Sequence, residues 1–112
     1  MKIDGFRSLA HIHNGQGELT SRNGNTFLGF AELAAWIAEH LRVESAVLDG
    51  EIACLDESGR PTFRDLIFRK RRCIFIAFDL LYLNGKDLRT LPLIERKAML
   101  KKLIRRKRAR MF

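Results

Sequence analysis

Residues 46–56 read AVLDGEIACLD, a segment in which acidic side chains interrupt an otherwise apolar run. The pattern predicts a β-strand running from Val47 to Leu55. Asp49 and Glu51 lie at positions i and i+2, so both carboxylates project from the same face of that strand. Carboxylates on a strand of this kind are costly unless they meet a metal, a base or a ligand hydroxyl. The segment therefore predicts a core strand and a candidate site, although LDGE alone is also typical of a turn at the end of a strand.

The elements on either side alternate between strands and helices. FRSLAHI (6–12) and GELTS (17–21) flank the turn formers HNGQG and predict a β-hairpin. Apolar residues recur at helical spacing over 30–41, with Trp36 half-buried in that helix, and CIFIAFDLLYL (73–83) predicts a buried strand. Further along the chain we expect a turn at ESGRP and a short helix at TFRDLIF. A final helix is predicted with Pro92 in its first turn, and its apolar side consists of Met99, Leu100, Leu103 and Ile104. ARMF predicts the start of another strand. The fold class expected is α+β, with mostly antiparallel strands and flanking helices.

Size and composition predict one globular domain. The chain has 112 residues, of which 46% are hydrophobic and 30% charged. No apolar run reaches the roughly 20 residues of a membrane span, and no apolar segment of a secretory signal is present near Met1. We therefore expect a cytoplasmic protein without a membrane partner. In that compartment Cys54 and Cys73, which have no CxxC partner, are expected to be two buried thiols.

The net charge of +8 is concentrated at one end of the sequence. Residues 101–112 carry seven Lys or Arg and no acid, whereas residues 1–100 carry 14 basic and 13 acidic residues. A second basic run, RKRR, occupies 69–72. Such clusters attract nucleic acid through counterion release, but they also occur as solvated edges beside apolar strands. Charge alone leaves both interpretations open.

A second group of polar residues lies in KIDGFR (2–7). In an extended segment Lys2 and Asp4 share a face, while Gly5 permits a turn or the close approach of a phosphate. Lys2 is a nucleophile only when it is neutral, and a neighbouring cation such as Arg7, or a bound metal, lowers its pKa. A motif this short also arises by chance.

The strand at 73–83 holds a third group. Phe78 lies beside Asp79, and a flat aromatic ring can stack on a nucleobase, although phenylalanine is more often part of a core. Together the three groups supply a nucleophile, a metal carboxylate, a base platform and phosphate-binding arginines, which suits nucleotidyl transfer. His11 and His13 share a strand face but have no third ligand at suitable spacing, so we expect an ordinary strand surface there.

Five segments in order carry a resemblance to a known family. The chain resembles the nucleotidyltransferase (adenylation) domain of ATP-dependent DNA ligases of the bacterial end-joining type, and mRNA capping enzymes share its lysine motif. KIDGFR is similar to the ligase motif around the adenylated lysine, and VLDGEI and FDLLYLNG are similar to motifs III and IIIa. The remaining likeness is carried by SRNGN (21–25) and LRTLPLIERKAML (88–100).

The resemblance implies roles for individual residues. Lys2 would attack the α-phosphate of ATP, and Arg7 and Arg22 would contact the nucleotide or the nicked strand. Glu51 would bind the ribose or Mg²⁺, and Phe78 would stack on adenine. In the family the AMP then moves to the 5′-phosphate of nicked double-stranded DNA, and the 3′-hydroxyl expels it. The basic residues implied in DNA contact are Arg7, Arg22, Lys101, Lys102, Arg105 and Arg106.

The resemblance also implies that residues 1–112 are a partial adenylation domain. The strand that precedes the lysine in the family, motifs IV and V and the OB-fold domain have no counterpart here, so we expect little nick sealing by this chain alone unless a separate chain supplies the missing motifs. One alternative is a non-catalytic basic remnant that binds nucleic acid through residues 101–112 and RKRR. Another is a gene relic that does not fold alone.

Overall fold

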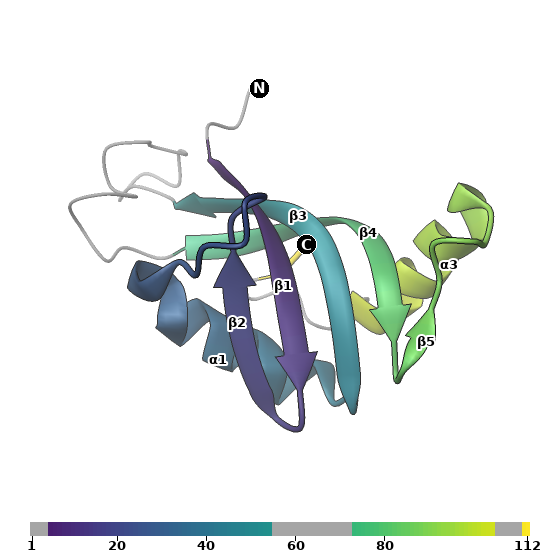
Figure 1. The fold of residues 1–112 in the computed structure, drawn as a ribbon, viewed down its shortest axis with the longest axis horizontal. Coiled ribbons are helices and arrows are strands. Elements are labelled where there is room, and N and C mark those ends of the chain that lie inside the picture. The colour runs from purple at the N-terminus through teal and green to yellow at the C-terminus, as the bar shows by residue number, and fades with distance from the viewer. Residues whose placement is uncertain (1–4, 55–72, 105–110) are drawn as a thin grey trace.

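The computed structural model describes residues 5–54, 73–104 and 111–112. Its centre is an antiparallel sheet of five strands in the order β2-β1-β3-β4-β5 (Figure 1). The strands are β1 (Phe6–His13), β2 (Gln16–Thr20), β3 (Ser45–Cys54), β4 (Cys73–Leu83) and β5 (Lys86–Asp87). The predicted strand around AVLDGEIACLD is thus confirmed and lies in the middle of the sheet. It pairs with β1 along one side and with β4 along the other, and its buried and half-buried residues alternate between the two faces.

Two Asn-Gly turns set the hairpins. Asn14 and Gly15 have φ values of 50° and 79°, and Asn84 and Gly85 have 49° and 83°. Two successive residues with positive φ form the tight turn whose twist matches the flanking antiparallel strands, and Asn-Gly is the dipeptide best suited to it. The predicted β1–β2 hairpin is confirmed, and the second turn adds the short strand β5, which the sequence did not indicate.

Helix α1 (Ala31–Leu41) covers one face of the sheet and passes behind β1 and β2 in Figure 1. A short 3₁₀ helix, η1 (Leu28–Phe30), leads into it. The buried side chains of α1 are Leu33, Ala34, Ile37, Ala38 and Leu41, and Trp36 of the same helix is half-buried as expected. They pack on alternate residues of the strands, including Ala10, Ile12, Leu19, Leu48, Ile52, Phe75 and Leu80. The opposite face carries Arg7, Asp49 and Glu51, which are all more exposed than these core residues.

Helix α3 (Leu93–Ile104) lies beside β4 and β5 (Figure 1). Pro92 directly precedes it, and the Pro92 carbonyl accepts hydrogen bonds from the Glu95 and Arg96 N–H groups at 3.0 and 3.2 Å. A proline costs nothing here because the N–H groups at the start of a helix have no partner within the helix. The apolar side is as predicted: Leu100 is buried, and Met99, Leu103 and Ile104 pack against the core. None of the helices in the described ranges is long and apolar enough to cross a membrane.

Residues 111–112 add a parallel bridge to β4. The Phe112 N–H donates to the Phe75 carbonyl at 2.9 Å, and the Ala77 N–H donates to the Phe112 carbonyl at 2.7 Å. Met111 is fully buried in the core. The predicted strand at ARMF is thus represented in the described residues by a single bridge at Met111, and its first two residues lie outside them.

The expectation of two free thiols is wrong, because Cys54 and Cys73 form a disulfide. The antiparallel register of β3 and β4 places the two cysteines directly opposite each other, although 19 positions separate them in sequence. Strand register is a tertiary property that cysteine spacing does not reveal. The predicted turn at ESGRP, the helix at TFRDLIF and the RKRR run lie outside the described residues, as do Lys2, Asp4, Arg105 and Arg106.

Candidate functional site

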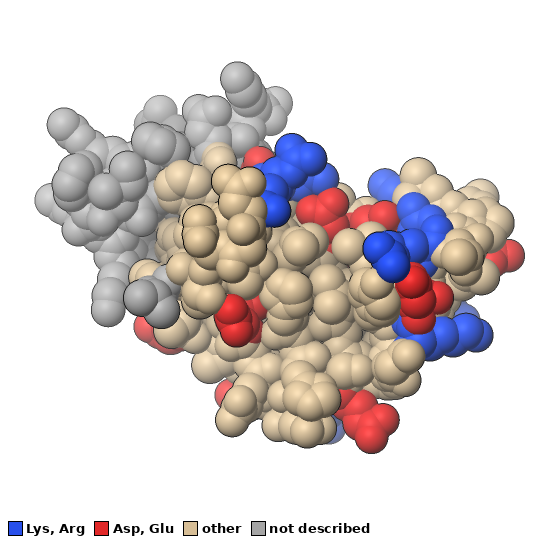
Figure 2. All heavy atoms as spheres, in the orientation of Figure 1, with Lys and Arg blue, Asp and Glu red and all other residues tan. Residues whose placement is uncertain are grey.

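Residues from three neighbouring strands meet at one end of the sheet face that α1 does not cover. The register pairs Arg7 of β1 with Glu51 of β3, and Asp49 of β3 with Asp79 of β4. Because alternate residues of a strand share a face, Asp49 and Glu51 both project to this side, as the sequence predicts. Figure 2 shows charged side chains gathered at this end of the sheet face and near α3, while the middle of the face is uncharged.

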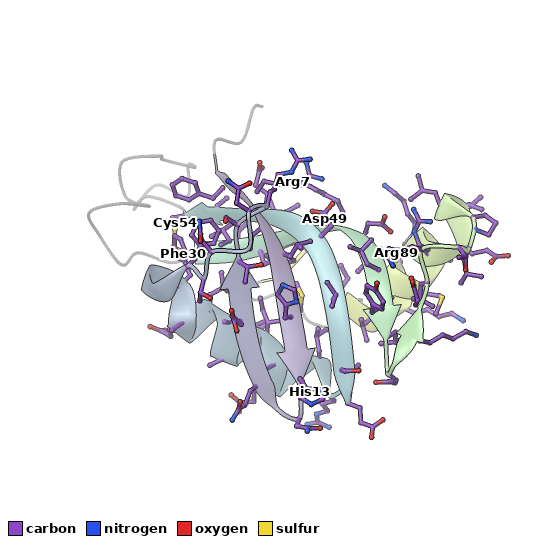
Figure 3. The ribbon with its side chains drawn as sticks, viewed as in Figure 1. Arg7, His13, Phe30, Asp49, Cys54 and Arg89 are labelled. Atoms are coloured by element: carbon purple, nitrogen blue, oxygen red, sulfur yellow. A yellow bond between two sulfur atoms is a disulfide. The ribbon has the colours of Figure 1, made fainter. Side chains whose placement is uncertain are left out.

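Arg7 and Asp49 form a bidentate ion pair. Arg7 Nε donates to Asp49 Oδ1 at 3.0 Å and Arg7 Nη2 donates to Asp49 Oδ2 at 2.8 Å, and Figure 3 shows the two side chains side by side. The hydrogen bonds to Asp49 and its charge raise the pKa of Arg7, and the charge of Glu51 adds to this effect. The paired geometry fixes the guanidinium plane in a way that a lysine could not.

Glu51, one of the predicted ligand-binding residues, lies on the same face as Asp49. It is half-buried directly across from Arg7, and within the described residues its carboxylate makes no hydrogen bond or ion pair. Its oxygens can accept from a ribose hydroxyl or bind a hard cation such as Mg²⁺. In the part of the chain that the structure describes, no three His, Cys, Asp or Glu side chains gather to hold a metal, so Glu51 would share Mg²⁺ with water and phosphate.

A β-bulge in β4 lies at Phe78. The register pairs Gly50 with Ala77 but Asp49 with Asp79, so Phe78 is the extra residue between them. Phe78 is three positions from Phe75, so strand alternation places the two side chains on opposite faces, and Phe78 is 37% exposed while Phe75 is fully buried. The bulge brings Asp79 onto the same face as Phe78, opposite Asp49. The Arg7 guanidinium carbon lies 5.4 Å from the centre of the Phe78 ring, within range of a cation–π interaction. Phe78 is therefore an accessible ring at the site and not part of the core.

Two glycines of the predicted motifs have structural reasons. A Cβ at Gly50 would lie 2.3 Å from the Ile76 carbonyl oxygen and 2.6 Å from Cζ of Phe75. A Cβ at Gly5 would lie 2.2 Å from the Ile52 carbonyl oxygen. The close approach at Gly5 is thus to the protein's own β3 backbone, where the sequence suggested a turn or a phosphate.

Sequence reasoning missed one residue beside the site, Arg96 of α3. Arg96 Nε donates to Asp79 Oδ1 at 3.0 Å and Arg96 Nη2 donates to Asp79 Oδ2 at 3.1 Å. This pairing raises the pKa of Arg96 through the hydrogen bond to Asp79. Arg96 lies 17 positions from Asp79 on a different element, so no local pattern could have identified it.

The remaining predicted residues do not join this cluster through any described contact. Arg22 is exposed in the turn at Ser21–Asn25, which closes through the Ser21 N–H to Asn25 carbonyl bond of 2.8 Å. Lys101 and Lys102 are exposed in the last turn of α3. His11 bonds Thr20 Oγ1 through its Nε2 at 3.0 Å. The described site therefore consists of Arg7, Glu51 and Phe78, supported by Asp49, Asp79 and Arg96.

Two solved structures of similar fold come from mycobacterial ligases. The ligase domain of M. tuberculosis LigD matches with a TM-score of 0.73 and 35% identity, covering 93% of this chain and 35% of that one. A mycobacterial DNA ligase D complexed with ATP and MES matches with the same TM-score, identity and coverage. The fold is that of a ligase nucleotidyltransferase domain.

The family follows from the sequence comparisons. The sequence model of the family described as ATP dependent DNA ligase domain matches residues 1–112. The chain therefore belongs to this family, as its ordered motifs predicted. The bifunctional non-homologous end joining protein LigD of Bacillus subtilis is 37% identical over 93% of this chain, and DNA ligase 2 of Methanosarcina acetivorans is 34% identical over 92%. The chain spans 20% and 21% of the length of these two relatives.

Proposed function

We propose that this chain is the nucleotide-binding part of an ATP-dependent DNA ligase, with Lys2 as the residue that accepts AMP. The observation that carries the proposal is the convergence of Arg7, Glu51 and Phe78 from three strands at one end of a sheet of the ligase fold. A relative of the same fold has been solved in complex with ATP.

Each described residue has a chemical task in this proposal. The accessible ring of Phe78 stacks on adenine, and the Glu51 carboxylate accepts a hydrogen bond from the ribose or helps to hold Mg²⁺. The Arg7 guanidinium, fixed by Asp49, offers its remaining N–H donors to ribose or phosphate oxygens. Mg²⁺, when bound, offsets the negative charge of the phosphates.

The reaction proposed at Lys2 is adenylation. The neutral amine Nζ attacks the α-phosphorus of ATP, the bond from that phosphorus to the bridging oxygen breaks, and pyrophosphate leaves with the electron pair. Nζ loses its proton to solvent, and a lysyl–AMP phosphoramidate remains. In the complete reaction the AMP passes to the 5′-phosphate of nicked double-stranded DNA, and the 3′-hydroxyl then displaces it. We further propose that the protein acts in the cytoplasm.

The test is self-labelling with ATP radioactive at the α-phosphate, in Mg²⁺, followed by a denaturing gel. Wild type should become labelled, and Lys2→Ala should not. Lys97→Ala, which removes an exposed lysine from α3, is the matched control and should label normally. A wild type that binds no ATP, or label that survives Lys2→Ala, would refute the proposal.

A binding measurement tests the platform separately. Phe78→Ala should weaken ATP binding by about 1–3 kcal/mol, the usual contribution of one base–aromatic stack. Tyr82→Ala removes another half-buried ring from the same strand, one that lies 5.0 Å from Arg89, and should leave the affinity unchanged. Equal losses in both variants would argue against a stacking role for Phe78.

The basic residues of 101–112 favour a second candidate function, non-catalytic binding of nucleic acid. Lys101 and Lys102 are exposed at the end of α3, as this function requires. Because Met111 is buried in the core, deleting the segment would also remove packing, so the test is the substitution of Lys101 and Lys102 by Gln. Affinity for duplex DNA should fall, and its dependence on salt should become less steep. Unchanged affinity would exclude these two lysines as DNA contacts.

A further inference from the structure

Two aspartates face each other across the strands that carry the site. The register of β3 and β4 pairs Asp49 directly with Asp79. Like charges directly opposite in an antiparallel sheet repel each other, and a half-buried position weakens screening by water. The side chains of Asp49 and Asp79 are only 25% and 18% exposed. Such a pair is tolerable only if each carboxylate is neutralised.

Each aspartate has an arginine of its own, and the two arginines come from different elements. Asp49 holds Arg7 of β1, whereas Asp79 holds Arg96 of α3. The result is a row of four charged residues, Arg7, Asp49, Asp79 and Arg96, in which the two aspartates are adjacent and an arginine stands at each end.

Arg96 is held more firmly than an ordinary surface arginine. Its Nη1 donates to the Leu91 carbonyl at 2.7 Å and to the Arg89 carbonyl at 3.4 Å, so the loop before α3 fixes the guanidinium. The Arg96 side chain is 16% exposed. On the other side, Asp79 Oδ1 accepts from the Leu80 N–H at 2.8 Å, next to the bulge at Phe78.

We propose that Arg96 is a positioning residue of the nucleotide site, acting through Asp79. Because Arg96 neutralises Asp79, the Asp79 carboxylate does not compete with Asp49 for Arg7. The Arg7 guanidinium therefore stays paired with Asp49, over the Phe78 ring. It also ties α3 to the strand segment that presents that ring. The proposal rests on the function proposed above, because ATP binding is one of its two readouts.

The charge argument makes a specific statement about variants. Arg96→Gln leaves the Asp79 carboxylate without its cation beside Asp49, so Asp79 repels Asp49 and competes for Arg7. Adding Asp79→Asn removes the unpaired charge. The double variant should therefore regain the Arg7–Asp49 pairing and the affinity for ATP, although it still lacks the Arg96–Asp79 ion pair. A role for Arg96 in packing alone predicts no such recovery.

The experiment uses the full chain and two measurements. The first needs no ligand: the NMR signal of the Arg7 Nε–H group, which donates to Asp49 in the structure, reports whether Arg7 keeps its partner. The second is the dissociation constant for ATP. The variants are Arg96→Gln, Arg96→Lys, the double variant Asp79→Asn with Arg96→Gln, and the control Arg89→Gln, which breaks an exposed pair with Asp87 on the same loop.

In Arg96→Gln the Arg7 signal should shift and ATP should bind about tenfold more weakly. The double variant and Arg96→Lys, which keeps the charge, should recover most of the wild-type Arg7 signal position and most of the affinity for ATP. Arg89→Gln should match wild type in both measurements. An unshifted Arg7 signal in Arg96→Gln, or a double variant as impaired as the single one, would overturn the proposal. If Arg96→Gln does not fold, the double variant and Arg96→Lys decide in the same way.

The two proposals can fail separately. If wild type binds no ATP while the Arg7 signal follows the expected pattern, the proposed function is wrong and the arrangement of charges stands. If ATP binds but the Arg7 signal ignores position 96, the positioning role is wrong and the nucleotide site stands.

Discussion

Gly50, between the two carboxylates of the central strand, offers the sharpest prediction about stability. In Gly50→Ala the new Cβ would lie 2.3 Å from the Ile76 carbonyl oxygen and 2.6 and 2.9 Å from Cζ and Cε2 of Phe75. Phe75 is fully buried, so its ring has little room to move, and a main-chain oxygen cannot rotate away. Overpacking of a core usually costs about 1–3 kcal/mol, and here we expect the upper end, about 3 kcal/mol.

Urea unfolding of the full chain measures this cost. With a slope of about 2 kcal/mol per molar urea, a loss of about 3 kcal/mol lowers the midpoint by about 1.5 M. Gly29→Ala is the matched control, since no atom lies within 4 Å of a Cβ at Gly29 and its φ is not in the left-handed region. That variant should be unchanged or more stable by up to about 1 kcal/mol.

A double-mutant cycle separates the ring from the backbone. Phe75→Leu removes the two ring atoms closest to the new Cβ, so the pair of substitutions should cost less than the sum of each alone. The packing explanation would be refuted if Gly50→Ala unfolded at the wild-type midpoint. It would also be refuted if the loss of unfolding free energy in the double variant equalled the sum of the losses in the two single variants.

Three further predictions concern other parts of the chain. Reducing the Cys54–Cys73 disulfide, which spans 19 positions, should lower the unfolding free energy by about 3 kcal/mol, measured by urea unfolding with and without a phosphine reductant; equal midpoints would contradict it. The hydrogen bond from Arg89 lowers the pKa of Asp87 to about 2, so its stabilising effect is present above pH about 4 and is lost as the pH falls toward 2. Carbon-13 NMR of the carboxyl should show this pKa rising toward 3.8 in Arg89→Gln, and no change would exclude the pairing. Ile37→Ala removes a fully buried side chain of α1 and should cost about 2–5 kcal/mol in the same unfolding assay, where a smaller loss would mean that α1 packs loosely.

Local sequence patterns predicted most of the elements. The Asn-Gly turn after His13, the helix that ends at Leu41 and the strand at Cys73–Leu83 each depend on residues close together in the chain. The same holds for the shared face of Asp49 and Glu51, which follows from strand alternation alone. These features are set by backbone sterics and by the period of the apolar residues, so a single sequence carries them.

The contacts within the site depend on register and could not be predicted in this way. The pairing of Asp79 with Asp49, on the face that carries Phe78, comes from a bulge that becomes visible only when β4 is aligned with β3. The partner of Asp49 could have been any nearby cation, and the structure selects Arg7. The predicted roles of Lys2, Arg105 and Arg106 lie outside the described residues and remain predictions.

By itself the sequence determined the α+β class, the order of the longer strands and helices and, through five ordered motifs, the ligase family that the comparisons confirm. The tertiary structure decided which distant residues meet: Cys54 with Cys73, Asp49 with Arg7, and Asp79 with Arg96. The physical reason is that side-chain periodicity is a property of one segment, whereas pairing across a sheet depends on a register that several segments set together.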